Sequence, residues 1–271
     1  MKYLQPLIDH YYRYRKGRGC FGNYATWAAA VHDCKGYDAA EIINKVHAAG
    51  LKVKKGEAQY ERDSALFYDE KTDENLLKFL ENAQNMEARH PEAIGAEGGM
   101  IRVLDFGGSL GSTYFQHKNR LKQYPNLIWC VVEQAHFVDI GKKDFEDDTL
   151  KFEYSVADAI EKYKPNIVLL SSVLQYLESP YEMLKMLFDT QIPYIFIDRT
   201  PFLLQNEDRI VKQIVPAYIY KASYPSWLFS KNKFQNFILP YTKIESAFTN
   251  TDRNNILNCR YEGFCLKRRS S

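Results

Sequence analysis

A glycine-rich turn between two acids is the part of this chain best suited to chemistry. The segment Asp105-Phe-Gly-Gly-Ser-Leu-Gly111 follows an apolar run, and Glu133 ends the next apolar run, 22 positions after Gly111. Glycines let the backbone approach a ligand closely, and the first turn of a following helix offers unpaired N–H groups. An acid at the end of the neighbouring strand can accept hydrogen bonds from both ribose hydroxyls. The pattern predicts a nucleoside site; the alternative is an ordinary strand–helix turn with a surface acid at Glu133.

The order of the glycines indicates which nucleoside is bound. The dinucleotide fingerprint G-x-G-x-x-G is absent, because Ser109 stands at its second glycine when counting starts from Gly107. The segment instead fits D-x-G-x-S-x-G, close to the S-adenosylmethionine pattern D/E-x-G-x-G-x-G. The loop has no basic residue, as expected for a cofactor without phosphates, and Asp105 suits the cofactor's amino group, directly or through water. We therefore expect S-adenosyl-L-methionine (SAM), with S-adenosyl-L-homocysteine (SAH) as product, to be bound by Asp105, Gly107, Gly108, Ser109, Gly111 and Glu133.

Residues that follow the later strands are the next candidates, since ligands of open α/β sheets lie at the carboxyl ends of the strands. Asp158 follows the third predicted strand and either contacts the adenine amino group or caps a helix. Ser171 and Ser172 follow the fourth strand and are assigned to cofactor binding. Gln175 and Tyr176 would lie beside the transferred methyl group, or else this segment only begins a helix with Tyr176 packed beneath it.

Asp198 and Arg199 end the fifth predicted strand. In a cleft, Asp198 is suited to take a proton from an acceptor hydroxyl, and Arg199 to hold a phosphate or carboxylate. The alternative is a structural ion pair between the two. The six histidines show no metal-ligand spacing and none follows the fourth or fifth strand, so we assign neither a histidine base nor a metal.

Aromatic residues are numerous, with 20 Tyr and 16 Phe. Most are expected to pack in the core, but the core fold offers no acceptor pocket of its own, so some should contact the acceptor. The residues assigned to acceptor binding are Tyr24, Trp27, Tyr220 and Tyr224.

The elements that position these residues change character along the chain. Residues 1–97 are expected to be mainly helical, with helices at 24–32, at 39–48 (capped by Asp38 and ended by Gly50) and at 73–89, then a linker at Gly95–Gly99. Residues 98–271 are expected to form the SAM-binding domain, with an aromatic-rich insertion at about 199–240. The predicted strands are 101–105, 128–133, 151–155, 166–171, 193–198, 242–248 and 261–267. Alternating strands and helices with a late strand pair predict a doubly wound, mostly parallel Rossmann-like sheet of the class I methyltransferase type, with an N-terminal helical extension or lid.

Composition excludes several function classes. The 36 basic and 34 acidic residues nearly balance, which argues against a nucleic-acid partner. The five cysteines are scattered, as expected for reduced thiols in a cytoplasm. No stretch resembles a secretory signal or reaches the ~20 apolar residues of a membrane span. We expect a cytoplasmic protein with a small-molecule substrate; the sequence does not indicate its oligomeric state.

Several motifs together resemble one bacterial family of SAM-dependent methyltransferases, often encoded among surface-polysaccharide (O-antigen or capsule) genes. They are Phe21-Gly-Asn-Tyr-Ala-Thr-Trp27, Asp105–Ser112, Leu169–Glu178, Phe196–Phe202 and Gln213–Trp227. The resemblance spans nearly the whole chain and implies O-methylation of a glycan precursor, small or nucleotide-linked, at a sugar hydroxyl or a phosphoryl-type oxygen. The alternatives are methylation of another small metabolite and a non-catalytic SAM-binding or scaffold subunit of glycan assembly.

Overall fold

The computed structural model describes residues 4–34, 39–69, 71–89, 100–217, 219 and 222–269. Its helices are α1 (Leu4–Tyr11), a π-helical turn η1 (Tyr12–Lys16), α2 (Trp27–Asp33), α3 (Ala39–Lys54), α4 (Glu74–Arg89), α5 (Ser112–Leu121), α6 (Ala135–Asp144), α7 (Val156–Tyr163), a 3-10 turn η3 (Leu174–Tyr176), α8 (Pro180–Asp189) and α9 (Lys231–Ile238). Its strands are β1 (Gly19–Tyr24), β2 (Tyr60–Arg62), β3 (Ala65–Phe67), β4 (Arg102–Phe106), β5 (Ile128–Val132), β6 (Leu150–Glu153), β7 (Ile167–Ser171), β8 (Tyr194–Leu203), β9 (Arg209–Ile214), β10 (Ser223–Ser230), β11 (Thr242–Thr249) and β12 (Cys259–Arg268).

Five parallel strands form the centre of the sheet, in the order β6-β5-β4-β7-β8. The chain order reverses at β4, which lies between β5 and β7, and this switch point is where such sheets bind ligands. The late pair adds an antiparallel edge, because β12 pairs with β8 and β11 pairs with β12. The predicted fold class is therefore confirmed: a mostly parallel, Rossmann-like sheet with the late antiparallel strands of the class I methyltransferase type.

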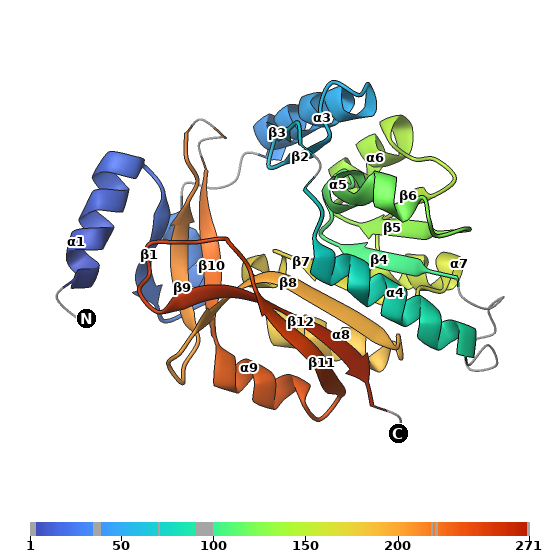
Figure 1. Ribbon diagram of the computed structural model, residues 1–271. Helices are drawn as coiled ribbons and strands as arrows, with labels where there is room; N and C mark the ends of the chain where they lie inside the picture. Colours follow the sequence, from blue (N-terminus) through green and yellow to red (C-terminus); the bar gives the residue numbers. More distant parts are fainter. Residues whose placement is uncertain are drawn as a thin grey trace.

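Helices cover both faces of this sheet, which explains why the central strands are continuously apolar (Figure 1). Neighbouring residues alternate between the two cores: Val103 packs with α4, α5 and α6 on one face, and Leu104 with α7, α8 and α9 on the other. Both side chains are at most 1% exposed. The two cores fix the strand ends, and through them the residues that follow each strand.

A second group of strands extends the sheet beyond β8. β1 and β10 both pair antiparallel with β9, and the end of β10 pairs parallel with the end of β8. Figure 1 shows β1, β9 and β10 steeply inclined to the central strands. The expectation of a mainly helical N-terminal region therefore missed β1, and the aromatic-rich segment after residue 199 contains β9 and β10. These strands bring the N-terminal segment to the carboxyl side of the sheet.

Two predicted helix boundaries were wrong. The helix expected from Tyr24 begins at Trp27, because Tyr24 still belongs to β1 and Thr26 caps the helix by accepting from the Ala29 N–H at 3.2 Å. The helix expected to stop at Gly50 continues to Lys54. The absence of a side chain at Gly50 allows close packing, because a Cβ there would lie 2.8 Å from the Phe145 ring.

Two further expectations, the Asp38 cap and the linker at residues 95–99, lie outside the described residues. Across the ranges that the structure does describe, no helix has both the length and the apolar character to cross a membrane.

Candidate functional site

A cavity of about 820 Å³ lies at the carboxyl ends of β4, β5 and β7. Residues of the N-terminal segment, β9 and β10 also line it, so both parts of the sheet contribute to the cavity. The predicted site residues that line it are Trp27, Asp105, Gly107, Gly108, Ser109, Glu133, Ser171, Ser172, Tyr176, Arg199 and Tyr224. The structure thus brings residues from both predicted halves of the site, cofactor and acceptor, to one continuous cavity.

The glycine loop folds tightly over the end of β4. A Cβ on Gly107, whose φ is +75°, would lie 2.5 Å from Cγ2 of Val173, and one on Gly108 would lie 2.5 Å from the Asp105 carboxyl. Ser109 adopts φ +56°, the left-handed region that favours glycine. This explains why glycine is usual at the middle glycine of the pattern, where this chain has Ser109.

Of the loop residues assigned to the cofactor, Gly111 alone does not line the cavity. Its φ is +90°, and it stands directly before α5, where a Cβ would lie 3.1 Å from Leu150. Gly111 therefore allows the turn to pack closely against Leu150, and the pattern requires glycine here because of the positive φ.

Two carboxyl groups flank the loop. Asp105 is 1% exposed, accepts a hydrogen bond from the Trp129 indole N–H at 2.9 Å, and has its pKa raised to about 7 by burial. The Glu133 carboxylate accepts from the Gln134 backbone N–H at 2.7 Å, and burial raises its pKa as well. Asp105 is buried and Glu133 is half-buried, and neither forms an ion pair with a residue that the structure describes, so a cationic ligand would offset the cost of ionising them.

Asp158 does not line the cavity. It lies in the first turn of α7, where its backbone N–H donates to the Ser155 hydroxyl and its carboxylate accepts from the same hydroxyl at 2.8 Å. The N-cap is therefore Ser155, and Asp158 completes a reciprocal cap three residues later.

The segment after β7 presents hydroxyls to the cavity. Ser171 and Ser172 line it, and Tyr176 on the η3 turn lies beyond them. Gln175 does not line the cavity: it is 1% exposed and donates to the Ser172 hydroxyl at 2.9 Å. Its position below the surface suits it to orient Ser172 rather than to touch a ligand.

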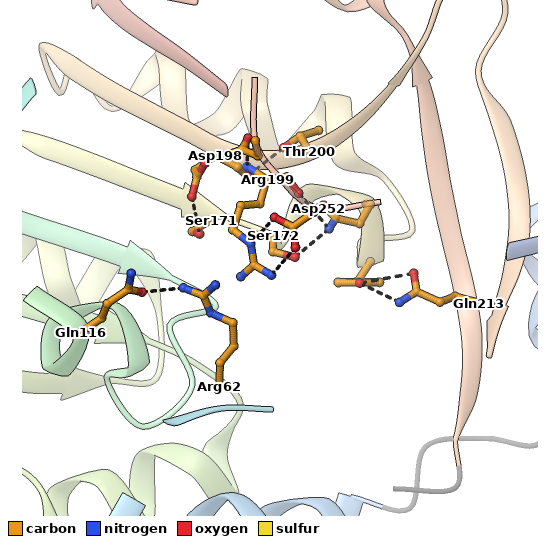
Figure 2. Close-up of polar contacts among 12 residues, drawn as sticks. Arg62, Gln116, Ser171, Ser172, Asp198, Arg199, Thr200, Gln213 and Asp252 are labelled. Carbon is orange, nitrogen blue, oxygen red and sulfur yellow. Dashed lines mark hydrogen bonds and ion pairs between the residues drawn. The ribbon is translucent and has the colours of Figure 1, made fainter. Parts of the chain in front are cut away.

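The Asp198 and Arg199 side chains have different partners, and Arg199 adopts φ +50° within β8 (Figure 2). Arg199 lines the cavity and forms a bidentate ion pair with Asp252, at 3.0 and 3.1 Å. Asp198 is 6% exposed and lies outside the cavity lining, where it accepts from the Asn250 amide at 2.7 Å and the Ser171 hydroxyl at 3.2 Å. Burial raises its pKa to about 6. The two residues therefore do not form the ion pair that was the alternative, and any contact of Asp198 with a substrate must pass through Ser171.

The predicted aromatic residues separate into two groups. Trp27 stacks on Trp227 with ring centres 6.0 Å apart, and Tyr224 meets Tyr176 edge to face at 5.2 Å. Tyr24 does not line the cavity, because its hydroxyl hydrogen-bonds to Asp33 at the surface. Tyr220 lies outside the described residues.

The lining also contains polar residues that were not predicted, among them Arg62, Gln213 and Asp252. Gln213 on β9 hydrogen-bonds to the Tyr176 hydroxyl at 3.2 Å. Arg62 is the last residue of β2 and donates to the Gln116 side chain on α5 at 2.5 Å (Figure 2). The local signal that could have indicated this hairpin is the turn-favouring pair Asp63-Ser64, in which both residues have positive φ.

No family model and no curated protein matches this chain. Among solved structures, the N-terminal domain of EvdMO1 with SAH bound is 12% identical, covers 86% of this chain and 98% of its own, and has a TM-score of 0.47. A SAM-dependent methyltransferase from Methanosarcina mazei is 8% identical over 62% of this chain and 92% of its own, with a TM-score of 0.44. The glycopeptide N-methyltransferase MtfA complexed with SAM is 8% identical over 69% of this chain and 92% of its own, with a TM-score of 0.42. At these identities and TM-scores the similarity concerns the fold alone, and activity has to be argued from the residues of the chain itself.

Proposed function

We propose that this protein is a SAM-dependent methyltransferase that methylates an oxygen atom of a small acceptor. The observation that carries the proposal is one continuous cavity joining Asp105, the glycine loop and Glu133 to Ser171, Tyr176 and Arg199. A methyltransferase needs its donor and acceptor in one water-poor space, because alignment of the two supplies most of the rate. The switch point of the sheet is the expected place for such a space.

The donor set suits SAM better than a phosphate-bearing nucleotide. The glycine loop contributes no basic side chain, and both side chains that flank it are acids. Asp105 is suited to bind the ammonium group of the cofactor and Glu133 the ribose hydroxyls. Gly107 and Gly108 leave space that a Cβ would fill. When bound, the cofactor supplies an electrophilic methyl group.

Proton removal from the acceptor is assigned to the Ser171–Asp198 pair. Ser171 lines the cavity, and its hydroxyl donates to Asp198 at 3.2 Å. With a pKa of about 6, Asp198 is mostly ionised at pH 7 and can take a proton. The acceptor hydroxyl would give its proton to the Ser171 oxygen while the original Ser171 proton passes to Asp198. Asn250 holds Asp198 in this orientation through its amide at 2.7 Å.

The acceptor belongs, in our proposal, to the glycan precursors of surface polysaccharide, methylated at a sugar hydroxyl or a phosphoryl-type oxygen in the cytoplasm. The resemblance of the motifs supports this assignment. The aromatic rings of Trp27, Tyr176 and Tyr224 along the cavity also support it, because flat rings with polar edges suit the faces of sugars. The segment 1–97 would act as the lid of the site, since Trp27 and Arg62 belong to it.

Calorimetric titration with SAH tests the proposal. The wild-type protein should bind SAH, and Glu133→Ala should weaken binding by about tenfold to a hundredfold, as expected for one or two charge-assisted hydrogen bonds. Asp148→Ala is the matched control, because Asp148 is an exposed acid outside the cavity lining. Transfer of a labelled methyl group from SAM to nucleotide-linked sugars would then identify the acceptor. Failure of the wild type to bind SAH would refute the proposal, whereas binding without transfer to any acceptor would favour a non-catalytic subunit.

A further inference from the structure

Two guanidinium groups from distant parts of the chain meet in the acceptor half of the cavity. Arg62 comes from the β2–β3 hairpin and Arg199 from β8, and both line the cavity. Figure 2 shows their guanidinium groups facing the same space. Burial lowers the pKa of Arg62, and the positive charge of Arg199 lowers it further. Two cations held this close favour an anion between them.

The two arginines differ in how their charge is balanced. Arg199 is paired with Asp252 through two hydrogen bonds. Arg62 forms no ion pair with any residue that the structure describes; its hydrogen-bond partner is the neutral Gln116. Asp252 therefore pairs directly with Arg199 only, and Asp63, which also lines the cavity, raises the pKa of Arg62 without forming an ion pair with it. A carboxylate or phosphate would give Arg62 a direct ionic partner and accept the planar fork of donors.

The position of Arg62 is built into the fold. The hairpin turn Asp63-Ser64 has φ of +51° and +65°, and the rings of Tyr60 and Phe67 stack across the two strands at 4.6 Å. Glu61, 3% exposed, accepts hydrogen bonds from the Ser64 backbone N–H and from Ser112 at the start of α5. The hairpin is thus attached to the helix that follows the glycine loop, and Arg62 is directed into the cavity.

The location of the pair favours the acceptor over the cofactor as the source of the anion. The cofactor residues follow β4 and β5, whereas Arg199 lies on β8, two strands away from β4 on the opposite side. At a strand spacing of about 4.8 Å, two strands correspond to about 10 Å. Tyr224 of β10 lines the cavity on the far side of β7 from β5, and Tyr176, which also lines it, packs edge to face on Tyr224.

We propose that Arg62 and Arg199 form an oxyanion subsite, and that the methyl acceptor carries a carboxylate or phosphate group that binds between them. This proposal rests on the proposed function, since it names a property of the acceptor of the same site. It also makes the N-terminal hairpin part of acceptor recognition.

Inorganic phosphate is the probe for this subsite, titrated calorimetrically into the protein with and without saturating SAH. Wild type should bind phosphate, and Arg62→Met should weaken that binding by about tenfold or more. Arg62→Lys should lose less, because it keeps the charge but not the fork. Asp252→Asn should tighten binding, because it removes the anion that competes for Arg199. Arg120→Met is the matched control: Arg120 lies on α5 outside the cavity lining and is 49% exposed, so phosphate affinity should not change.

A second titration separates the two possible sources of the anion. SAH carries a carboxylate, whereas 5′-methylthioadenosine keeps the nucleoside and lacks the amino-acid part. If Arg62→Met weakens SAH binding by tenfold or more and leaves 5′-methylthioadenosine unchanged, Arg62 holds the cofactor carboxylate and our proposal is overturned. Equal phosphate affinities in wild type and Arg62→Met, or no phosphate binding by wild type, would overturn it too. If phosphate binds as expected and SAH does not, the subsite stands and the proposed methyl transfer fails.

Discussion

Replacing Asp105 with Asn separates the contribution of this side chain to stability from its contribution to binding. Asp105 is 1% exposed and accepts from the Trp129 indole at 2.9 Å. Asn has nearly the same shape and keeps an oxygen for that hydrogen bond, so the substitution removes the charge with little change in packing. The two contributions are expected to change in opposite directions.

The stability effect follows from the raised pKa. Burial raises the pKa of Asp105 from 3.8 to about 7. Between pH 3.8 and about pH 7, Asp105 is protonated in the folded protein and ionised in the unfolded chain. The free energy of unfolding that depends on Asp105 is therefore highest below pH 3.8 and falls until about pH 7. About 3 pH units correspond to about 4 kcal/mol at most. At pH 8 and without cofactor, Asp105→Asn should therefore be more stable than wild type, by up to about 4 kcal/mol.

The binding effect has the opposite sign. If the ionised carboxyl holds the ammonium group of SAH, wild-type affinity should rise as pH increases through about 7, where Asp105 ionises. Asp105→Asn should bind SAH about tenfold to a hundredfold more weakly at pH 8, since one charge-assisted hydrogen bond contributes about 1.5–3 kcal/mol. Urea denaturation at pH 5 and pH 8 measures the first effect, and calorimetric titration measures the second.

Glu61→Gln provides the matched control. Burial also raises the pKa of Glu61 to about 7, but Glu61 lies outside the cavity lining. Its substitution should likewise stabilise the protein at pH 8 while leaving SAH affinity unchanged. Two outcomes would refute the reasoning for Asp105: a variant less stable than wild type at pH 8, or one that binds SAH with wild-type affinity and pH dependence.

Three further substitutions test the loop and the proton path. Ser109→Gly should stabilise the protein by up to about 1 kcal/mol, measured by urea denaturation. The substitution removes the penalty of about 1–2 kcal/mol for a left-handed backbone, but it also increases the conformational entropy of the unfolded chain. A loss of stability would show that the contacts of the Ser109 side chain outweigh the cost of its backbone conformation. Gly108→Ala should abolish SAH binding measured by calorimetry, because the new Cβ would lie 2.5 Å from the Asp105 carboxyl; wild-type affinity would show that the loop can move away. Ser171→Ala and Asp198→Asn should lower kcat by similar factors, about a hundredfold, with SAH affinity unchanged; an effect confined to one of them would exclude the relay.

The central strands were predictable because each is a short apolar run followed by a turn. β5, for example, was expected at 128–133 and runs from Ile128 to Val132, where Trp129 is fully buried. The residues at the strand ends followed from this, since parallel strands place their carboxyl ends at one edge. Asp105, Glu133 and Ser171 reach the cavity for that reason. A pattern confined to a few neighbouring residues was sufficient to place these three side chains at the cavity.

The missed features all depend on pairing between segments far apart in the sequence. β1 is stabilised by β9, almost two hundred positions later, as in the pairing of Gly19 with Ile214. The β2–β3 hairpin has only three residues in each strand, too few for an alternating pattern to be recognised. Asp252 lies beyond β11, and no local signal connects it with Arg199. The partner of Asp198 was equally hidden, because Asn250 lies 52 positions later in the chain.

The two halves of the cavity are built from different parts of the chain, which bears on the specificity for the acceptor. The cofactor half is built from the ends of β4 and β5 and the loop between β4 and α5, which all belong to one compact unit of the sheet. The acceptor half combines Arg62 from the hairpin, Tyr224 from β10 and Asp252 from the loop after β11. Under the proposed function, changes in these outer segments would alter the acceptor without disturbing the buried strands beside the proposed cofactor residues. The identity of the acceptor is then expected to depend on the segments that are added to the central sheet, among them the hairpin that carries Arg62.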